Sequence, residues 1–600
     1  MHCSYYGGVS GRSGAMHVAK VSKKYVDQAG KERVYDSFLL RRSYRQDGKV
    51  KHATVANVSE LSNEQLDVLR RTLRGERLVP ASAGGQVLRS LPHGDVAAVM
   101  VQAKALGLPA LLGPAGRQRD LALALIVSRV VHPGTKLATL SWWGDTTLGA
   151  DLGVAGASTD EVYAAMDWLL GRQDSIEARL ARRHLSDEAS NPHRMALFDL
   201  SSSWLEGRHC PLAARGYSRD GKKGKLQIEY GLLTDPDGRP VAVRVFKGNT
   251  GDPTAFKQAV TAVRDTFGLR QMVMVGDRGM ITNARIDALK QLPVEDGWAW
   301  LTCLRADQIR RLAADGGPVQ MSLFDQQDLV EISHPEYPDE RLVACRNPAQ
   351  ADERARKRQD LLAATETLLA PIVAAVAKGR LTGSDKIGLK VGKVVGTYKM
   401  AKHFTVDITD ESLAITRNQA SIDAEAALDG IYVIRTSVTA DRLDASGVVV
   451  AYKNLSHVER DWRNIKVDDL DLRPVHHWLA DRVRAHVLIC MLAEHLTWHL
   501  RRALAPLTYT DEQPPTRDNP VAPAQRSAAA ARKASRHRDE RDQPLRSFRG
   551  LLTHLATLSR NNIQYGRDDN APIVPTLAVP TPTQRRAFEI LGAPVPLTLA

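Results

Sequence analysis

The spacing of hydrophobic and polar residues changes several times along the chain. In the first regular segment, hydrophobic and polar residues alternate. Residues 17 to 58 form short alternating runs that are broken at Ala29-Gly30 and at Asp47-Gly48. A two-residue turn between alternating runs is typical of a β-hairpin, so this segment predicts two successive hairpins.

The next segment has helical periodicity. Apolar residues recur at three- and four-residue spacing between 94 and 188, and Ser158 with Glu161 forms a capping box ahead of VYAAMDWLL. Short helices with basic edges can enter the major groove of DNA, although most helical bundles do not. The segment therefore predicts a helical region, and its contact with DNA stays an open alternative to a purely structural role.

Strand patterns begin at Met195. The runs MALFDL, KLQIEYGLLT and PVAVRVF predict a meander, and the wholly apolar MVMV at 272–275 is typical of a strand buried on both faces. Asp199 ends the first of these strands and Asp277 follows the last one. Two acidic residues are thus expected where two central strands end side by side, the edge at which α/β sheets place their chemistry.

Residues 305–428 fit neither this sheet nor the helix that should complete it. They mix short strand-like runs with a strong helical pattern, which predicts an insertion domain. The sheet pattern resumes at 429–437, and a long apolar helix is expected over 474–504. Residues 506–545 are poor in apolar residues and rich in Pro, Ala and charge, which predicts a disordered linker.

The run YKNLSHVERDWRNIK at 452–466 predicts an amphipathic helix. Tyr452, Glu459 and Lys466 recur every seven residues and would form one stripe with Arg463, beside an apolar face. Such a pattern can be an ordinary solvated surface, in which Glu459 and Arg463 form an i,i+4 ion pair of roughly 0.3 kcal/mol. The following residues make up the apolar face: Leu455, Val458, Trp462 and Ile465.

Charge points to a polyanionic partner. The chain of 600 residues has a formal net charge of +14 and a pI near 9.5, and the stretch from His17 to Lys51 is especially rich in Lys and Arg. This balance suits nucleic acid, although many basic proteins bind none, and a charged sheet face can be simply solvated.

Cysteine usage and hydropathy narrow the protein class further. The five cysteines lack CxxC spacing, which disfavours a zinc ribbon or a disulfide framework and fits a reducing compartment. The apolar stretch at 483–500 is interrupted by charged residues and histidines, so a membrane span is not expected there. His495 and His499 lack the HExxH order and are interpreted as core or surface residues.

Three motifs together carry a family resemblance. Asp199 in FDLSSSWLEG, Asp277 in VMVGDRGM and Glu459 in YKNLSHVERDWRNIK stand in the order found in bacterial insertion-sequence transposases of the DDE class, which the chain resembles. It looks like the branch with the signature Y-x2-R-x3-E-x6-K, except that Leu455 occupies the Arg position, and we infer that Arg463 supplies that cation. Further matches are GYSRDGKKGKLQIEYGLL, FKGNTGD, DGIYVIRTS and RPVHHWLADRVRAHVLICMLA.

The resemblance implies an α/β fold with an RNase H-like catalytic core, which a β-rich insertion domain interrupts before the Glu459 helix. It also implies a reaction of DNA strand cleavage followed by strand transfer. In-line displacement at phosphorus uses two metal ions held by carboxylates. Asp199, Asp277 and Glu459 are the expected catalytic residues and ligands of two Mg²⁺ ions, for which Mn²⁺ can substitute, with Asp199 bridging both. Tyr452, Arg463 and Lys466 are expected to bind DNA phosphates.

The implied partners are the terminal inverted repeats and the target, both double-stranded DNA, with a homodimer in the DNA complex and a cytoplasmic, nucleoid-associated location. Two alternatives remain: an RNase H-like nuclease that cuts without joining, and a domesticated DNA-binding protein without catalysis. The expected organisation is 1–85, basic β-hairpin unit; 86–190, helical region; 191–304, first part of the core; 305–428, insertion; 429–505, second part of the core; 506–545, linker; 546–600, C-terminal helix and tail.

Overall fold

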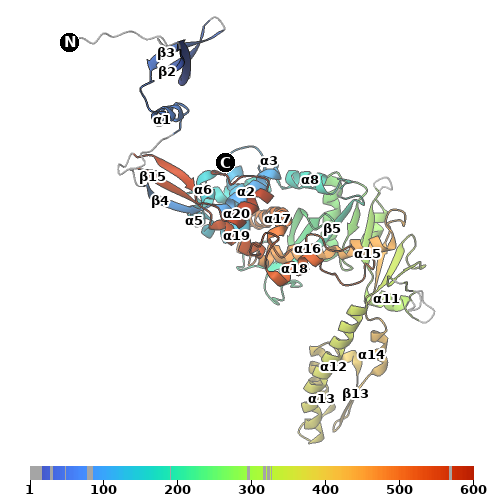
Figure 1. Ribbon diagram of the computed structural model, residues 1–600. Coiled ribbons are helices and arrows are strands. Elements are labelled where there is room, and N and C mark those ends of the chain that lie inside the picture. Colours follow the sequence, from blue (N-terminus) through green and yellow to red (C-terminus); the bar gives the residue numbers. More distant parts are fainter. Residues whose placement is uncertain are drawn as a thin grey trace. The chain divides into compact units, whose positions relative to one another are not determined.

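The chain folds into two compact units, which are described separately (Figure 1). The first comprises Met1–Ser90 with Asn561–Thr576, and the second comprises Leu91–Arg560 with Leu577–Ala600. The computed structural model describes residues 16–26, 31–46, 49–76, 85–189, 191–292, 297–314, 319, 324–325, 327–565 and 571–599.

The first unit contains the alternating N-terminal segment. Strands β1 (Met16–Val26), β2 (Glu32–Gln46) and β3 (Lys49–Asn57) form an antiparallel sheet in that order, as the pattern predicted. The predicted turn residues Ala29-Gly30 and Asp47-Gly48 lie outside the described residues. The sequence pattern did not predict helix α1 (Asn63–Leu73), although Ser62 and Gln65 give it a complete capping box.

A second small sheet takes its strands from the two ends of the chain. Its order is β16-β15-β4, so the C-terminal strands join the end of the N-terminal segment. The C-terminal tail was expected to hold only a helix and an extended chain, whereas it also supplies these strands. The elements are β4 (Gly85–Pro92), β15 (Ser559–Tyr565), β16 (Ile573–Leu577), α19 (Phe548–Ala556) and α20 (Pro582–Ile590).

The second unit opens with the predicted helical region. The helices are α2 (Gly94–Ala105), α3 (Leu108–Leu112), α4 (Arg117–Val131), α5 (Lys136–Trp143), α6 (Thr147–Asp151), α7 (Thr159–Leu170) and α8 (Gln173–His184). Every residue of α4 from Leu121 to Val130 is buried, and α4 packs against α7 and against the long helix α17 (Ala480–Ala503). The interior of this region is therefore a hydrophobic core, and the predicted capping box of Ser158 with Glu161 starts α7.

An eight-stranded mixed sheet forms the middle of the second unit. Its order is β10-β11-β14-β9-β8-β5-β6-β7, in which β5, β8 and β9 are parallel neighbours and the other pairs are antiparallel. Helix α17 packs on β7 and α9 packs on β5 and β6. The elements are β5 (Met195–Trp204), β6 (Gln227–Thr234), β7 (Pro240–Lys247), α9 (Asp252–Thr261), β8 (Val273–Val275), α10 (Asn283–Lys290), β9 (Ala299–Cys303), α11 (Ala306–Leu312), β10 (Leu329–Ile332), β11 (Arg341–Arg346) and β14 (Ile431–Thr436).

The segment 305–428 is mainly helical, so the expected β-rich insertion was wrong. Strands β10 and β11 lie within it but extend the central sheet, because β11 pairs with β14 along its whole length. The rest is α12 (Pro348–Ala377), α13 (Ser384–Thr397), the hairpin β12 (Phe404–Ile408) with β13 (Leu413–Arg417), and α14 (Gln419–Ala426). Figure 1 shows α12 beside α13, and Leu369, Val376 and Ile387 are buried between these elements.

Residues 506–545 are folded, in contrast to the expected disordered linker. They contain α18 (Ala528–Arg536), and Ser527 caps the N-terminus of this helix. The Lys453 ammonium donates to the carbonyl oxygens of Pro520 and Val521 at 2.5 and 2.9 Å. Low apolar content misled the prediction because these contacts join backbone carbonyls to a distant helix and need no apolar side chain.

Helix α12 also has the length and apolar content of a membrane span, the only single helix of the described residues with both. Core helices of other proteins meet the same criteria, so length and apolar content alone do not identify α12 as a membrane span. The pair α4 and α5, which meets them jointly, is bent by 98°.

Candidate active site

The central sheet brings Asp199 and Asp277 next to each other. Strands β5 and β8 are parallel, with Met195 opposite Val273 and Leu197 opposite Val275. Continuing this register by two residues places Asp199 beside Asp277, where β8 has just ended. The two acids therefore lie side by side just beyond the carboxyl end of β8, as predicted, but Asp199 does not end its own strand as expected, because β5 continues to Trp204.

Both carboxylates line a cleft of about 410 Å³ at this edge of the sheet. The loop between β7 and α9 and the loop before β6 provide most of its other walls. The cleft is lined by Asp199, Leu200, Gly216, Tyr217, Arg219, Glu229, Asn249, Thr250, Gly251, Asp252, Asp277 and Met280.

The two aspartates differ in their surroundings. Burial raises the pKa of Asp199 to about 7, and repulsion from the carboxylates of Asp277 and Glu459 acts in the same direction. Asp277 is exposed, and its Oδ1 accepts hydrogen bonds from the backbone N–H groups of Gly279 and Met280, each at 2.9 Å. The local turn thus fixes the orientation of Asp277, while Asp199 lies where a bound cation would relieve the repulsion between carboxylates.

Glu459 reaches this region from helix α16 (Leu455–Arg463), which packs on β5. Val458 and Trp462 of α16 are buried, and the Trp462 ring lies 4.9 Å from the ring of Tyr230 in β6. The apolar face that the pattern predicted therefore anchors the helix on the sheet, while the Glu459 side chain is exposed. Glu459 does not line the cleft, but its charge acts on Asp199.

The predicted single helix over 452–466 is wrong, because the segment consists of three pieces. Helix α15 (Ala445–Lys453) ends before Asn454, α16 follows it, and Asn464–Asp468 forms a π-helical turn. A break and a wider turn change the phase of the helix, so a seven-residue spacing no longer keeps side chains on one stripe. Tyr452, Glu459 and Lys466 consequently lie in three different elements.

Lys466, which was expected to bind a DNA phosphate, is a buried residue with protein partners. Its ammonium lies 2.5 Å from Asp220 Oδ1 and donates to Ser201 Oγ at 3.0 Å. Burial lowers the pKa of Lys466, and the bond to Asp220 opposes this change. The side chain therefore ties the π-helical turn to β5, two residues beyond Asp199.

Two further positions of the signature, and the neighbouring Arg463, have distinct environments. Tyr452 is half-buried, and burial and the neighbouring Cys303 thiol raise the pKa of its hydroxyl. Leu455 is half-buried against the core, at the first position of α16. Arg463 is exposed on the last turn of α16, so it is the cation of this group that solvent reaches most readily.

Three charged residues of the cleft were not among the predicted site residues. Arg219 forms ion pairs with Asp252 at 2.6 Å and with Glu229 at 3.7 Å. Asp252 begins α9 and lines the cleft. The sequence pattern could have indicated Glu229, because this residue is the one acid in the otherwise uncharged run of β6. An acid in a buried strand needs a partner.

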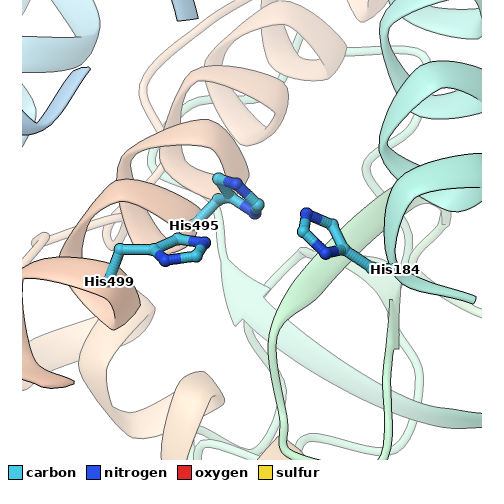
Figure 2. A group of neighbouring side chains, drawn as sticks. All are labelled: His184, His495 and His499. Carbon is cyan, nitrogen blue, oxygen red and sulfur yellow. The ribbon is translucent and has the colours of Figure 1, made fainter. Parts of the chain in front are cut away.

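A group of three histidines lies apart from this cleft. Figure 2 shows His184 of α8 facing His495 and His499 of α17, and one nitrogen of each ring lies within 4.8 Å of the others. Burial lowers the pKa of His184 to about 2, of His495 to about 4 and of His499 to about 3. All three imidazoles are therefore neutral at neutral pH, which is the form that binds metals.

Neighbouring groups oppose a metal ion at these histidines. The Arg239 guanidinium donates to His184 Nδ1 at 2.5 Å, so the proton of this neutral ring lies on Nε2 and is directed away from Arg239. A fixed guanidinium charge beside the rings also repels a divalent cation. The site fits packed neutral histidines better than metal ligands, in line with the interpretation of His495 and His499 from the sequence.

Comparison with known proteins identifies two regions of the chain. Residues 201–493 match a family model described as "Transposase DDE domain", which starts two residues after Asp199 and contains Asp277 and Glu459. Residues 23–81 match "IS1634 family transposase, N-terminal domain".

Whole-chain similarity is slight. No curated protein matches the sequence. Among solved structures, a piggyBac transposase synaptic complex with hairpin DNA, determined by cryo-EM, matches with 9% identity and a TM-score of 0.30, over 67% of this chain and 71% of that chain. A similarity this low supports no argument about fold or mechanism.

Proposed function

The chain belongs to the DDE transposases of insertion sequences, and we propose that Asp199, Asp277 and Glu459 are its catalytic carboxylates. The observation that carries this assignment is the parallel register of β5 and β8, which places Asp199 beside Asp277 in one cleft. The charge of Glu459 reaches Asp199 from α16. Transposases of this class depend on divalent metal ions, and we propose Mg²⁺ as the ion, with Mn²⁺ as a substitute.

The donor set fits such ions. Hard divalent cations prefer oxygen ligands, and carboxylates that raise each other's pKa are stabilised when a cation binds between them. When bound, two such ions activate the attacking water or 3′-hydroxyl and stabilise the leaving oxygen. The protein holds the Asp277 side chain by its turn, and the packing of α16 on β5 holds the backbone that carries Glu459.

The strand arrangement supports an RNase H-like core. In β7-β6-β5-β8-β9, an antiparallel meander is followed by two parallel strands, with one acid on the first strand of the meander and another after β8. The third acid comes from a helix that packs on β5. We propose that Arg463 contacts DNA phosphate, since it is exposed next to Glu459, and that Tyr452 and Lys466 mainly position this region.

The DNA partners and the assembly belong to the same proposal. We propose that the protein binds the terminal inverted repeats of its element and joins them to target DNA as a homodimer in the cytoplasm. Basic residues of the first unit support contact with the DNA backbone, although Lys20 and Lys24 already pair with Asp36 and Glu32.

Cleavage and joining of labelled DNA that carries the element ends would test the assignment. In Mg²⁺, Asp199→Ala, Asp277→Ala and Glu459→Gln should each lose at least a hundredfold in cleavage while they still bind the ends. Asp352→Asn, which removes an exposed carboxylate on α12, is the matched control and should cleave normally. Normal cleavage by Asp199→Ala would contradict the assignment.

The same assay separates the two alternatives. A nuclease of this fold would cleave the ends but would not join them to target DNA. A domesticated binding protein would bind the ends without cleaving or joining them. The family match and the three carboxylates favour the transposase over both.

A further inference from the structure

A second cleft of about 500 Å³ lies between the start of α5 and the segment that follows the π-helical turn. Its walls are rich in groups that carry or can acquire positive charge. It is lined by Arg129, Gly134, Thr135, Lys136, Leu137, Tyr163, Asp471, Leu472, Arg473, Pro474, His476, His477 and His486.

Two cations of this cleft are buried without a counter-ion. Arg129 is 4% exposed and Lys136 is 7% exposed. Arg129 donates only to carbonyl oxygens, those of Leu470 at 3.2 Å and Gly134 at 2.9 Å. Throughout the part of the chain that the structure describes, no carboxylate forms an ion pair with either side chain, and Asp471 is exposed at the rim. Buried Arg and Lys are rare unless they are paired, so an anion bound in this cleft would stabilise both positive charges.

The Lys136 ammonium has unused donor capacity. Its hydrogen-bond partner among the described residues is His486 Nδ1, at 3.4 Å, although an ammonium can donate three hydrogen bonds. The other ring nitrogen of His486 is 3.3 Å from the Leu472 carbonyl, which fixes the ring. Burial and the charge of Arg129 lower the pKa of Lys136 to about 7, the direction expected for an ammonium that is buried beside another cation.

The backbone adds a third positive element. Helix α5 begins at Lys136, and Thr135 caps it by accepting from the Ala138 N–H at 3.2 Å. The positive end of the helix is thus directed into the same cleft as the two cations. Beside it lies a shallower hollow of about 280 Å³ that contains Trp478, which is 64% exposed.

We propose that this cleft binds a phosphate group through Lys136 and Arg129, and that the group is a phosphodiester of the DNA strand that enters the active site. This rests on the proposed function. Arg473 connects the two sites, since it lines the cleft and its guanidinium lies 2.5 Å from Asp220, the carboxylate that holds Lys466. Exposed Trp478 offers a face on which a neighbouring base can stack.

Lys136→Met tests the proposal because it keeps an unbranched apolar stem of nearly the same length and removes the ammonium with its charge. Loss of an unpaired buried ammonium should leave the protein at least as stable as the wild type, so weaker binding cannot be attributed to unfolding. Lys104→Met removes an exposed lysine of α2 and is the matched control. The probes are inorganic phosphate, compared with chloride at equal ionic strength, and a fluorescent DNA duplex that carries the element end.

Phosphate should raise the melting temperature of the wild type and of Lys104→Met but not that of Lys136→Met. If the ligand is DNA phosphodiester, Lys136→Met should also lower the association constant for the duplex about tenfold and reduce the slope of log K against log salt by about 1. Loss of the phosphate effect with unchanged DNA affinity would identify a free phosphate anion as the ligand. Unchanged behaviour of Lys136→Met with both probes would overturn the proposal.

These outcomes are separate from the test of the catalytic carboxylates. If Asp199→Ala loses cleavage and Lys136→Met behaves as the wild type, the phosphate site is wrong and the proposed function stands. If Asp199→Ala cleaves normally, the proposed function fails, while the response to inorganic phosphate still tests the cleft.

Discussion

Lys466 and Asp220 form a buried ion pair of 2.5 Å, which joins the π-helical turn behind Glu459 to the loop before β6. The Asp220 side chain is 1% exposed and also binds Arg473 at 2.5 Å. One carboxylate therefore pairs with two cations next to the active site, and the position of the turn depends on it.

Asp220→Asn should destabilise the protein by about 3 kcal/mol, because removing one partner of a buried pair leaves unpaired charge behind. Lys466→Met should cost less, since Arg473 still neutralises Asp220. Urea unfolding followed by fluorescence measures both, with Asp352→Asn as the exposed control. The double variant should lose less than the two single losses together, because both act on one network. An Asp220→Asn protein that unfolds like the wild type would contradict the pairing.

Arg463→Ala should affect DNA binding and leave folding unchanged. Arg463 is exposed on the last turn of α16, and surface substitutions of this kind alter stability by about 0.5 kcal/mol or less. Loss of a phosphate contact should weaken binding equally for all DNA sequences and lower the salt slope by about 1. Fluorescence anisotropy over a salt series provides the measurement. If this variant binds and cleaves normally, Arg463 does not replace the arginine of the family signature.

Sequence patterns predicted the paired aspartates because their signals are local. An apolar run followed by an acid can be recognised without knowing its neighbours, and Asp199 and Asp277 both have this context, although β5 continues beyond Asp199 to Trp204. The break at Asn454 could not be found in the same way, since residues on both sides of it continue a helical pattern. Where a helix breaks is decided by packing against distant elements, which the sequence does not display.

Glu229 and Lys466 show the same limit at the site itself. Each is a charged residue whose partner lies outside its own strand or helix: Arg219 reaches Glu229 from a loop, and Asp220 reaches Lys466 across about 250 residues. A pattern can show that a buried charge needs a partner, but it does not identify that partner. The expected position of Lys466 on a stripe with Glu459 was wrong because the helix breaks and Lys466 is buried against Asp220.

Glu229→Gln should make the protein more stable than the wild type at neutral pH but not in acid. Burial raises the pKa of Glu229 to about 7, with the Arg219 charge opposing the rise. A carboxyl group that is harder to ionise in the folded state lowers the free energy of unfolding as pH rises. For Glu229 this loss extends from the unfolded pKa of 4.5 to about 7. The advantage of Glu229→Gln should therefore grow through this interval and stay constant above it. Melting temperatures in EDTA between pH 4 and pH 8 would show this, and a difference that does not vary with pH would contradict it.

Zn²⁺ should bind poorly to the histidines of Figure 2 in the wild type and better after Arg239→Met. The Arg239 guanidinium donates to His184 Nδ1 at 2.5 Å and adds a positive charge where the metal would lie, whereas methionine removes both effects. Isothermal titration with Zn²⁺ measures binding directly, so a change in stability of the variant does not obscure the result. Adding His495→Ala to Arg239→Met should abolish the gained affinity, because one of the three rings is lost. Tight equimolar binding by the wild type that His499→Ala removes would show instead that the three histidines form a metal site despite Arg239.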